Sequence, residues 1–427
     1  MKKVILGLLL VSIMMLAACS SGSNETASET ETEKITVWAW DPNFNIKAMN
    51  LARDAYASVN PDLEIEIIEY AQNDIIQKLN TSLSSGTKSG LPNIVLIEDY
   101  RAQSFLQAYP DAFHKLTGSF NTNDFAQYKI APTSLDGENY GLPFDTGVTG
   151  MYVRTDYLEQ AGYTIDDVTN IDWNDYIEIG KKVKEVTGKH MLTLDPNDLG
   201  LVRMMIQSSG SWYLKEDGTT PDLIENEALK EAFSLYKELI EADLVKPVSD
   251  WSQFLAGFNG GDVATVVTGN WITPSVKAEA SQSGNWAVVA QPRLPGMANS
   301  VNASNLGGSS WYVLDLDGKE EATDFLAKTF GSNVELYQKF VTEIGAMGTY
   351  NPASEGEAYQ VEDKFFSGQQ ILVDFSKWSE AIPQVNYGLH TYVVEDILVV
   401  AMQDYLNGKD IDSALKEAQQ QADAQIR

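Results

Sequence analysis

Strand-like and helix-like segments alternate regularly between residues 35 and 97. The β-branched and aromatic run at 35–40, the alternation of apolar and acidic residues at 63–67 and the apolar run at 94–97 are typical of strands. Between these runs, apolar residues at helical spacing predict helices over 49–59 and 76–83. The run at 94–97 is apolar throughout, as in a parallel strand that is buried on both faces. This β-α-β-α-β order predicts an α/β fold with a mainly parallel sheet.

The stretch 140–153 has the features of a crossing between two lobes, and a chain of 427 residues exceeds one ordinary domain. Pro143 has a fixed φ and no backbone donor, which suits a crossing or a sheet edge and not a central strand. Gly147 and Gly150 bracket a short β-branched run, where the backbone can bend or approach a ligand. We therefore expect Asp145 at the mouth of a cleft. The alternative is an ordinary turn and strand inside one large α/β domain.

The residues YGLPFDTGVTGMYVRTDYLEQAG, which begin at Tyr140, resemble the signature segment of the family 1 extracellular solute-binding proteins. These proteins are the carbohydrate receptors of ATP-binding-cassette importers and are relatives of maltose-binding protein. A predicted buried strand at 263–267 leads to Gly269, Asn270 and Trp271, an ending that is also similar to the family. The stretch 304–311 resembles a further crossing, where adjacent glycines permit the rotation of a hinge.

The resemblance implies a periplasmic-binding-protein-like fold, with two discontinuous lobes, central mainly parallel sheets and hinge crossings. The first lobe would comprise residues 35–144 and 271–308, and the second lobe residues 145–270 and 309–427. A sugar or oligosaccharide would bind between the lobes, and closure would trap it for delivery to the permease subunits of an importer. By the same resemblance the protein would act as a monomer, without a cofactor or a metal.

Candidate ligand-binding residues follow from a rule for open α/β sheets, in which ligands bind beyond the carboxyl ends of the strands. The first three predicted strands bring Trp40, Asn73 and Asp99 to such a rim, beside other aromatic and acidic residues. Aromatic faces cover the C–H surface of sugars, and carboxylates accept hydrogen bonds from hydroxyls. The full set that we expect in the cleft is Trp40, Asn73, Asp99, Asp145, Trp212, Asn270, Trp271 and Trp311. The alternatives are core packing for each tryptophan and a helix cap or solvated loop for each acid.

Residues 1–18 have the organisation of an export signal: two lysines, an apolar stretch and two alanines. The only cysteine, Cys19, follows directly, and LAAC at 16–19 resembles the lipobox of bacterial lipoproteins. This resemblance implies a diacylglycerol thioether on Cys19 and anchoring at the extracellular face of the cell membrane. The alternative is a chance cysteine near an ordinary secretory cleavage site. Residues 19–34 would form the lipidated cysteine and a flexible linker, because almost none of them is apolar.

The formal net charge of −30 argues against nucleic acid and anionic lipid as partners. The alternative function is a surface-anchored glycoside hydrolase, which also combines tryptophans with a pair of carboxylates. With 60 acidic residues some pair can always be proposed, so a pair in the sequence is weak evidence. A non-catalytic adhesin would show surface repeats, and the sequence has none. The motifs of serine hydrolases, zinc proteases and phosphate-binding loops are also missing, and we therefore expect a receptor and not an enzyme.

Overall fold

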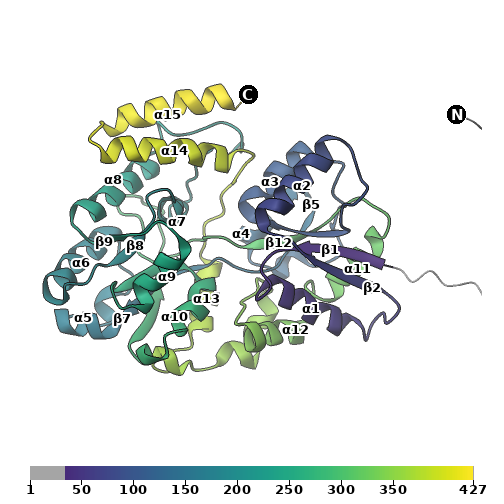
Figure 1. Ribbon diagram of the computed structural model, residues 1–427, viewed down its shortest axis with the longest axis horizontal. Helices are drawn as coiled ribbons and strands as arrows, with labels where there is room; N and C mark the ends of the chain where they lie inside the picture. Colours follow the sequence, from purple (N-terminus) through teal and green to yellow (C-terminus); the bar gives the residue numbers. More distant parts are fainter. Residues whose placement is uncertain (1–33, 427) are drawn as a thin grey trace, which may run out of the picture. The chain divides into compact units, whose positions relative to one another are not determined.

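The computed structural model describes residues 34–426, which form two main sheets and fifteen α-helices (Figure 1). The strands are β1 Lys34–Ala39, β2 Glu64–Glu69, β3 Ile94–Glu98, β4 Ser134–Leu135, β5 Glu138–Asn139, β6 Gly141–Pro143, β7 Thr149–Arg154, β8 Leu192–Leu194, β9 Val245–Pro247, β10 Thr265–Gly269, β11 Trp286–Ala290 and β12 Ser309–Val313. The helices are α1 Asn45–Tyr56, α2 Gln72–Ser84, α3 Asp99–Ala108, α4 Gln127–Ile130, α5 Thr155–Ala161, α6 Trp173–Thr187, α7 Gly200–Ser208, α8 Glu227–Glu241, α9 Trp251–Asn259, α10 Thr273–Lys277, α11 Lys319–Lys328, α12 Val334–Lys339, α13 Ile371–Glu380, α14 Thr391–Leu406 and α15 Ile411–Gln425. None of the helices between residues 34 and 426 is both long enough and apolar enough to cross a membrane. The predicted export signal, Cys19 and the linker up to residue 33 lie outside the described residues.

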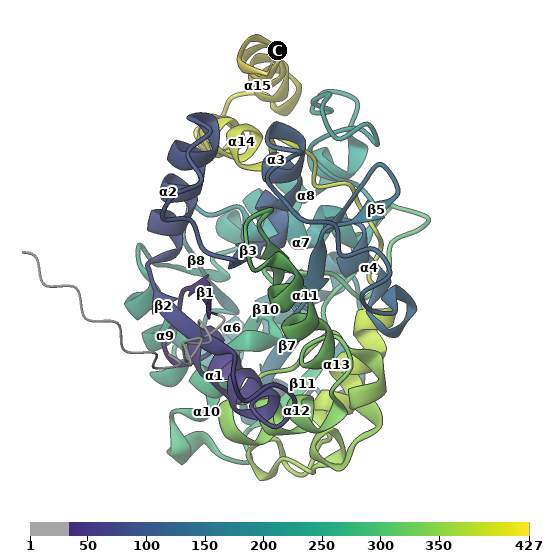
Figure 2. The same cartoon turned by 90° about the vertical axis from the view of Figure 1, so that its right-hand side faces the viewer.

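The first sheet has the strand order β2-β1-β3-β12-β6 and is covered by helices on both faces. Side chains alternate along each strand, so Val37 and Leu96 belong to one core cluster with α1 and α11, while Trp38 and Val95 belong to another with α2 and α3. Figure 2 shows this arrangement, with α2 and α3 at the top and α1 and α12 at the bottom. Burial on both faces explains why the run in β3 is apolar throughout.

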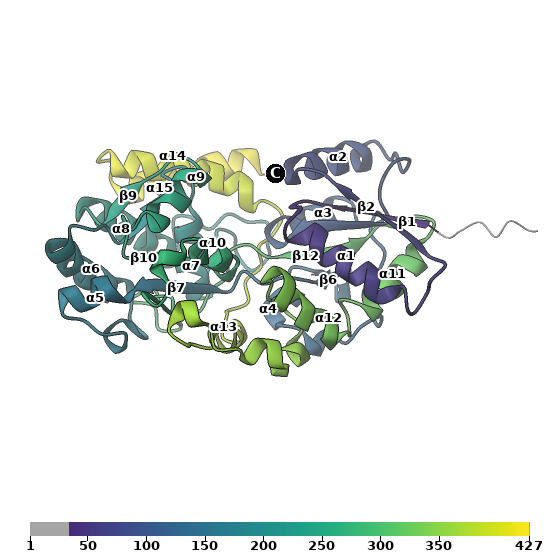
Figure 3. The same ribbon diagram turned by 60° about the horizontal axis from the view of Figure 1, so that its bottom comes forward.

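The second sheet has the order β10-β7-β11 and also separates two layers of helices. Met151 and Val153 of β7 contact the cluster built from α6, α7 and α8, whereas Tyr152 points to the opposite layer. There its ring lies 6.1 Å from Phe375 of α13, which packs against this face (Figure 3). Helix α6 begins at Trp173, because Asp172 and Asp175 form a reciprocal capping box at its first turn.

The strand directions differ from the expectation of mainly parallel sheets. In the first sheet β1 pairs in parallel with β2 and β3, but β12 runs antiparallel to both β3 and β6. The second sheet is antiparallel at both of its pairings. The cause lies in the connections: β12 enters the first sheet from the other lobe and is not the end of a β-α-β unit, so no parallel direction is imposed on it.

The strand pairings also correct the expected assignment of two segments to lobes. Strand β11 lies within residues 271–308, which we expected in the first lobe, yet it pairs with β7 of the second sheet. Strand β12 lies within 309–427, which we expected in the second lobe, yet it pairs with β3 of the first sheet. The crossing near Gly307 therefore leads into the first sheet and not out of it. Helices α11 and α12 then pack on the same core as β1, and the chain leaves this sheet after α12.

Trp311 is a core residue and not a cleft residue. It lies in the middle of β12 with no exposed surface, and its ring contacts Phe144 and Phe330 at centroid distances of 5.6 and 5.4 Å. The Gly- and Ser-rich residues before it favoured a loop, but pairing on both sides, with β3 and β6, makes this segment a central strand. Its ring has no surface to offer a ligand, so we remove Trp311 from the proposed site.

Candidate ligand-binding site

A cleft of about 590 Å³ lies where several strands end, which is a volume typical of small-molecule sites. Its lining combines aromatic rings, carboxylates and small polar groups: Trp40, Asp41, Asn43, Phe44, Asn45, Gln72, Glu98, Asp145, Trp251, Trp271, Pro274, Ser275, Gly307, Gly308, Ser309 and Ile344. The first-sheet side is supplied by the residues after β1 and at the end of β3. The other side is supplied by α9 and by the residues after β10. The lining therefore comes from segments that belong to both main sheets.

The turn after β1 is held in an uncommon conformation. Asp41 has φ of 62°, a left-handed value that Asp tolerates because its short side chain can bond to the nearby backbone. Its Oδ1 accepts hydrogen bonds from the backbone N–H groups of Asn43 and Phe44, at 2.9 and 3.2 Å. These bonds replace a side-chain cap at the start of α1 and keep Trp40 and Asp41 in the cleft wall.

Two tryptophans form the opposite wall. Trp251 begins α9, where Asp250 caps the helix, and it is 52% exposed and stacked on Phe254 with an interplanar angle of 19°. Trp271 lies next to it, with ring centroids 5.9 Å apart. The indole Nε1 of Trp271 donates to the carbonyl oxygen of Leu306 at 2.8 Å, which fixes the ring against the crossing. A half-exposed, well-supported indole face is suited to stack on the apolar face of a sugar ring.

The cleft is acidic. Three carboxylates, of Asp41, Glu98 and Asp145, are in its lining, and no lysine or arginine is found among the described lining residues. A second cavity of about 180 Å³ shares Trp251 with the cleft and adds Asp195, Asp198 and Asp250 to an otherwise mainly apolar lining. Such a surface accepts hydrogen bonds from hydroxyls and repels anions. Within residues 34–426 no group of three His, Cys, Asp or Glu side chains is placed to hold a metal ion.

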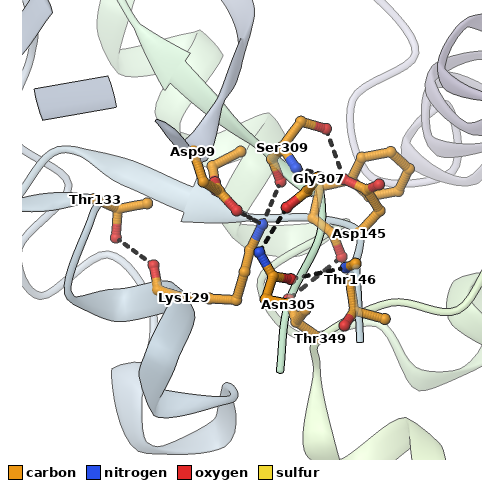
Figure 4. A network of polar contacts seen from close by, with 12 residues as sticks. Asp99, Lys129, Thr133, Asp145, Thr146, Asn305, Gly307, Ser309 and Thr349 are labelled. Atoms are coloured by element: carbon orange, nitrogen blue, oxygen red, sulfur yellow. Dashed lines mark hydrogen bonds and ion pairs between the residues drawn. The ribbon is translucent and has the colours of Figure 1, made fainter. Parts of the chain in front are cut away.

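A buried ion pair lies behind the cleft at the crossing (Figure 4). The Lys129 ammonium contacts Asp99 Oδ2 and donates to the carbonyl oxygen of Ser309 at 2.9 Å, with both charged side chains almost fully buried. Ser310 donates to the other oxygen of Asp99 at 2.8 Å. Burial raises the pKa of Asp99 to about 6, although the Lys129 charge acts in the opposite direction. Asp99 is therefore a structural residue and not the ligand-binding residue that we expected.

Asp145 connects this network to the cleft. Its Oδ1 accepts hydrogen bonds from the N–H and the hydroxyl of Ser309, at 2.7 and 2.6 Å, while the residue remains part of the cleft wall. Gly307 and Gly308 precede Ser309 with φ of 85° and 92°, which side chains rarely adopt. A Cβ on Gly308 would also lie 3.0 Å from Asp99 Oδ2. The crossing thus needs glycine both for its conformation and for space beside the ion pair.

Of the other residues that we expected in the site, the structure brings Trp40, Asp145 and Trp271 together in the cleft. Asn73 is exposed on the first turn of α2 and is not in the lining, although the adjacent Gln72 is. Trp212 is buried, stacks on Tyr100 at 5.6 Å and donates to Thr391 at 2.8 Å, so it is a core residue.

Asn270, the eighth expected residue, is buried at the end of β10, and its Oδ1 has no partner among the described residues. It is not part of the cleft lining. Thirteen of the sixteen lining residues were outside our expected set, among them the acidic Asp41 and Glu98 and the aromatic Trp251. The first two carried a signal, since each lies at or just after the end of a predicted strand.

Comparison with known proteins assigns the family. Residues 52–364 match the family described as bacterial extracellular solute-binding protein. The lactose-binding protein of Rhizobium radiobacter is 44% identical over 395 residues, which cover 92% of this chain and 93% of that protein. The chain belongs to the bacterial extracellular solute-binding proteins. The expected family is therefore confirmed, and membership places the protein outside the cytoplasm, in the periplasm or at the extracellular face.

Solved structures confirm the two-lobed α/β fold of this solute-binding protein. The sugar-binding protein MalE of Xanthomonas citri superposes with a TM-score of 0.77 at 16% identity, over 92% of this chain and 96% of that chain. A binding protein of Bifidobacterium animalis subsp. lactis, solved with β-1,6-galactobiose, gives 0.69 at 19% identity, over 92% and 98%. The chain thus shares its fold with the sugar-binding protein MalE and with a binding protein associated with an ATP-binding-cassette transporter.

We predict that Lys129→Met lowers the free energy of unfolding by about 3–5 kcal/mol, because it leaves the buried Asp99 carboxylate without its counter-charge. The loss should be smaller at pH 5 than at pH 8. Because the pKa of Asp99 is raised in the folded state, the folded protein binds more protons than the unfolded chain and gains stability as the pH falls. The variant gains more than the parent, because Lys129 no longer lowers this pKa. Urea denaturation at both pH values measures the effect.

Lys47→Met, at an exposed lysine of α1, is the matched control and should change stability by less than about 0.5 kcal/mol. A loss that is equal at both pH values would contradict the assignment of Lys129 as counter-ion to Asp99.

Proposed function

We propose that the cleft captures a neutral short oligosaccharide, in the first instance a galactoside disaccharide such as lactose, for an ATP-binding-cassette importer. The observation that carries this proposal is one cleft lined by three tryptophan rings, Trp40, Trp251 and Trp271, together with three carboxylates and without a cation. The relative at 44% identity is named for lactose, and a structural neighbour holds a galactobiose. Other relatives are named for arabinooligosaccharides, so pentose chains are the competing ligands.

The proposed receptor works by lobe closure and not by catalysis. The chain crosses between the two sheets after β6, before β12 and again after α12, and Gly307 and Gly308 give one crossing its rotational freedom. A sugar that contacts residues from both sides of the cleft favours the closed arrangement, which the permease subunits would recognise. The relatives' function as transport receptors supports this assignment over a glycoside hydrolase.

We further propose that the receptor is a lipoprotein held at the membrane through Cys19, as the lipobox at 16–19 implies. The folded body would be a monomer on a flexible tether. Mass spectrometry of the mature chain from its own host should find Cys19 as the N-terminal residue with a diacylglycerol thioether. A mature chain that begins elsewhere and carries no lipid would contradict the anchor.

A panel of sugars tests the ligand class on the protein from residue 34 onward. Neutral galactosides should raise its melting temperature, because they bind only the folded state, and calorimetry should give the tightest binding for a disaccharide. A disaccharide with a uronate in place of one neutral unit should bind much more weakly, since its carboxylate would face Asp41, Glu98 and Asp145. Product analysis after prolonged incubation should find the sugar unchanged. Release of shortened sugar at enzyme-like rates would favour the hydrolase.

Trp251→Ala tests the aromatic wall. We expect it to weaken sugar binding by about 2 kcal/mol, roughly thirtyfold, while the ligand-free protein loses little stability because the ring is half-exposed. Trp311→Ala is the matched control at the core position and should show the reverse: a loss of about 3–5 kcal/mol in unfolding free energy. Calorimetry and urea denaturation on both variants separate the two roles. Unchanged affinity in Trp251→Ala would remove this residue from the site.

A further inference from the structure

One carboxylate of the cleft is held by residues that do not themselves line it. Glu98 is the last residue of β3, paired in the sheet with Ser309 of β12, and its side chain is 18% exposed. Its Oε2 accepts a hydrogen bond from the hydroxyl of Tyr392 at 2.6 Å. The same oxygen lies 3.6 Å from Nε of Arg101. The other oxygen, Oε1, has no hydrogen bond to any residue between 34 and 426.

The donor on Glu98 comes from the other half of the molecule. Tyr392 is the second residue of α14, and α14 packs through Leu398 and Met402 into the core that contains Met151 and Val153 of β7. Glu98 belongs to the first sheet. The hydrogen bond from Tyr392 therefore joins the strand that reaches the cleft to a helix of the second lobe.

Neighbouring cationic side chains contact the ring of Tyr392, and its hydroxyl keeps its proton. The Arg101 guanidinium lies 3.9 Å from the centre of its ring, a cation–π contact, and Arg203 lies 5.9 Å away on an element of the second lobe. Arg203 is in turn paired with Glu395, one helical turn after Tyr392, at 3.2 Å. Burial, and after it the negative charge of Glu98, raises the pKa of Tyr392 well above its usual value, so the phenol remains protonated.

We propose that Tyr392 and Arg101 are positioning residues for sugar binding: they fix Oε2 of Glu98 so that Oε1 is presented to a hydroxyl of the ligand. This inference rests on the proposed function. A glutamate at a strand end has three rotatable bonds, and an unrestrained carboxylate would lose that freedom when it binds a hydroxyl. The hydrogen bond from Tyr392 and the nearby charge of Arg101 restrict it beforehand. Because Tyr392 belongs to the second lobe, Glu98 is in place only while α14 contacts the end of β3.

The competing interpretation is a contact that serves stability alone. Partly exposed ion pairs contribute little to the free energy of folding. If the contact served stability alone, its loss would leave the affinity for the sugar unchanged. A positioning role predicts instead that the effect of Tyr392 on affinity depends on the presence of Glu98. A double-mutant cycle measures this dependence directly.

The test uses Tyr392→Phe, which removes the donor and keeps the ring beneath Arg101, with the best-binding sugar of the panel as ligand. We expect Kd to rise about tenfold, as for the loss of a hydrogen bond to a charged group. Glu98→Ala should also raise Kd. In the Glu98→Ala background, adding Tyr392→Phe should change Kd by less than about twofold, because the group that Tyr392 positions is gone. Tyr405→Phe is the matched control: it lies near the end of the same helix, makes no hydroxyl hydrogen bond to the described residues, and should leave Kd unchanged.

Each remaining outcome is decisive. Equal losses of affinity from Tyr392→Phe with and without Glu98 would show that Tyr392 does not act through this carboxylate, and would overturn the inference. An unchanged Kd in Tyr392→Phe would overturn it as well, and a lower melting temperature of the ligand-free variant would then assign the contact to stability. If no sugar binds the parent protein, the proposed function fails and this inference fails with it. If a sugar binds and the cycle shows no coupling, only the inference fails.

Discussion

The arrangement at the crossing depends on one buried ion pair, Lys129 with Asp99. Isolated charges are costly inside a protein, and this pair is satisfied because the backbone of Ser309 and the hydroxyl of Ser310 complete its hydrogen bonds. Those two serines begin β12, so the ion pair determines where the strand enters the first sheet. Asp145 then holds the N–H of Ser309 from the neighbouring crossing. Two crossings are thereby tied together at the base of the cleft, and the cleft wall is built upon them.

The cleft shows how the fold separates structural from ligand-binding groups. The ion pair of Lys129 and Asp99, which stabilises the crossing, is almost fully enclosed, whereas Trp40, Glu98 and Trp251 of the cleft lining lie at strand ends or at the start of a helix. Asp99 and Glu98 are adjacent in the sequence, yet Glu98 ends β3 and lines the cleft, whereas Asp99 begins α3 and is buried. An acidic lining of this kind suits neutral hydroxylated ligands, in agreement with the sugar receptors that share the fold.

The sequence predicts where the strands and helices of this protein lie better than it predicts which strands pair with one another. Alternation and apolar runs locate β1, β2 and β3, and apolar residues at helical spacing locate α1 and α2, because these signals are local. The direction and partner of β12 are set by a crossing and are not visible in a five-residue strand. Trp251 is an instructive case: it was not among the residues that we expected in the cleft, but its place at the first position of α9 leaves the ring half-exposed. Lys129 gave no signal at all, because its partner lies thirty residues earlier.

The bond from Trp271 to Leu306 has a mechanical consequence. This indole forms part of the cleft wall. Its N–H donates to the backbone carbonyl oxygen directly before the two glycines of the crossing. A ligand that moved the ring would therefore also move the segment that we propose as a hinge. The occupancy of the cleft and the arrangement of the lobes would be linked through a single side chain, without a relay of intermediate residues. In such a receptor the residue that contacts the ligand would also be the residue that starts the movement.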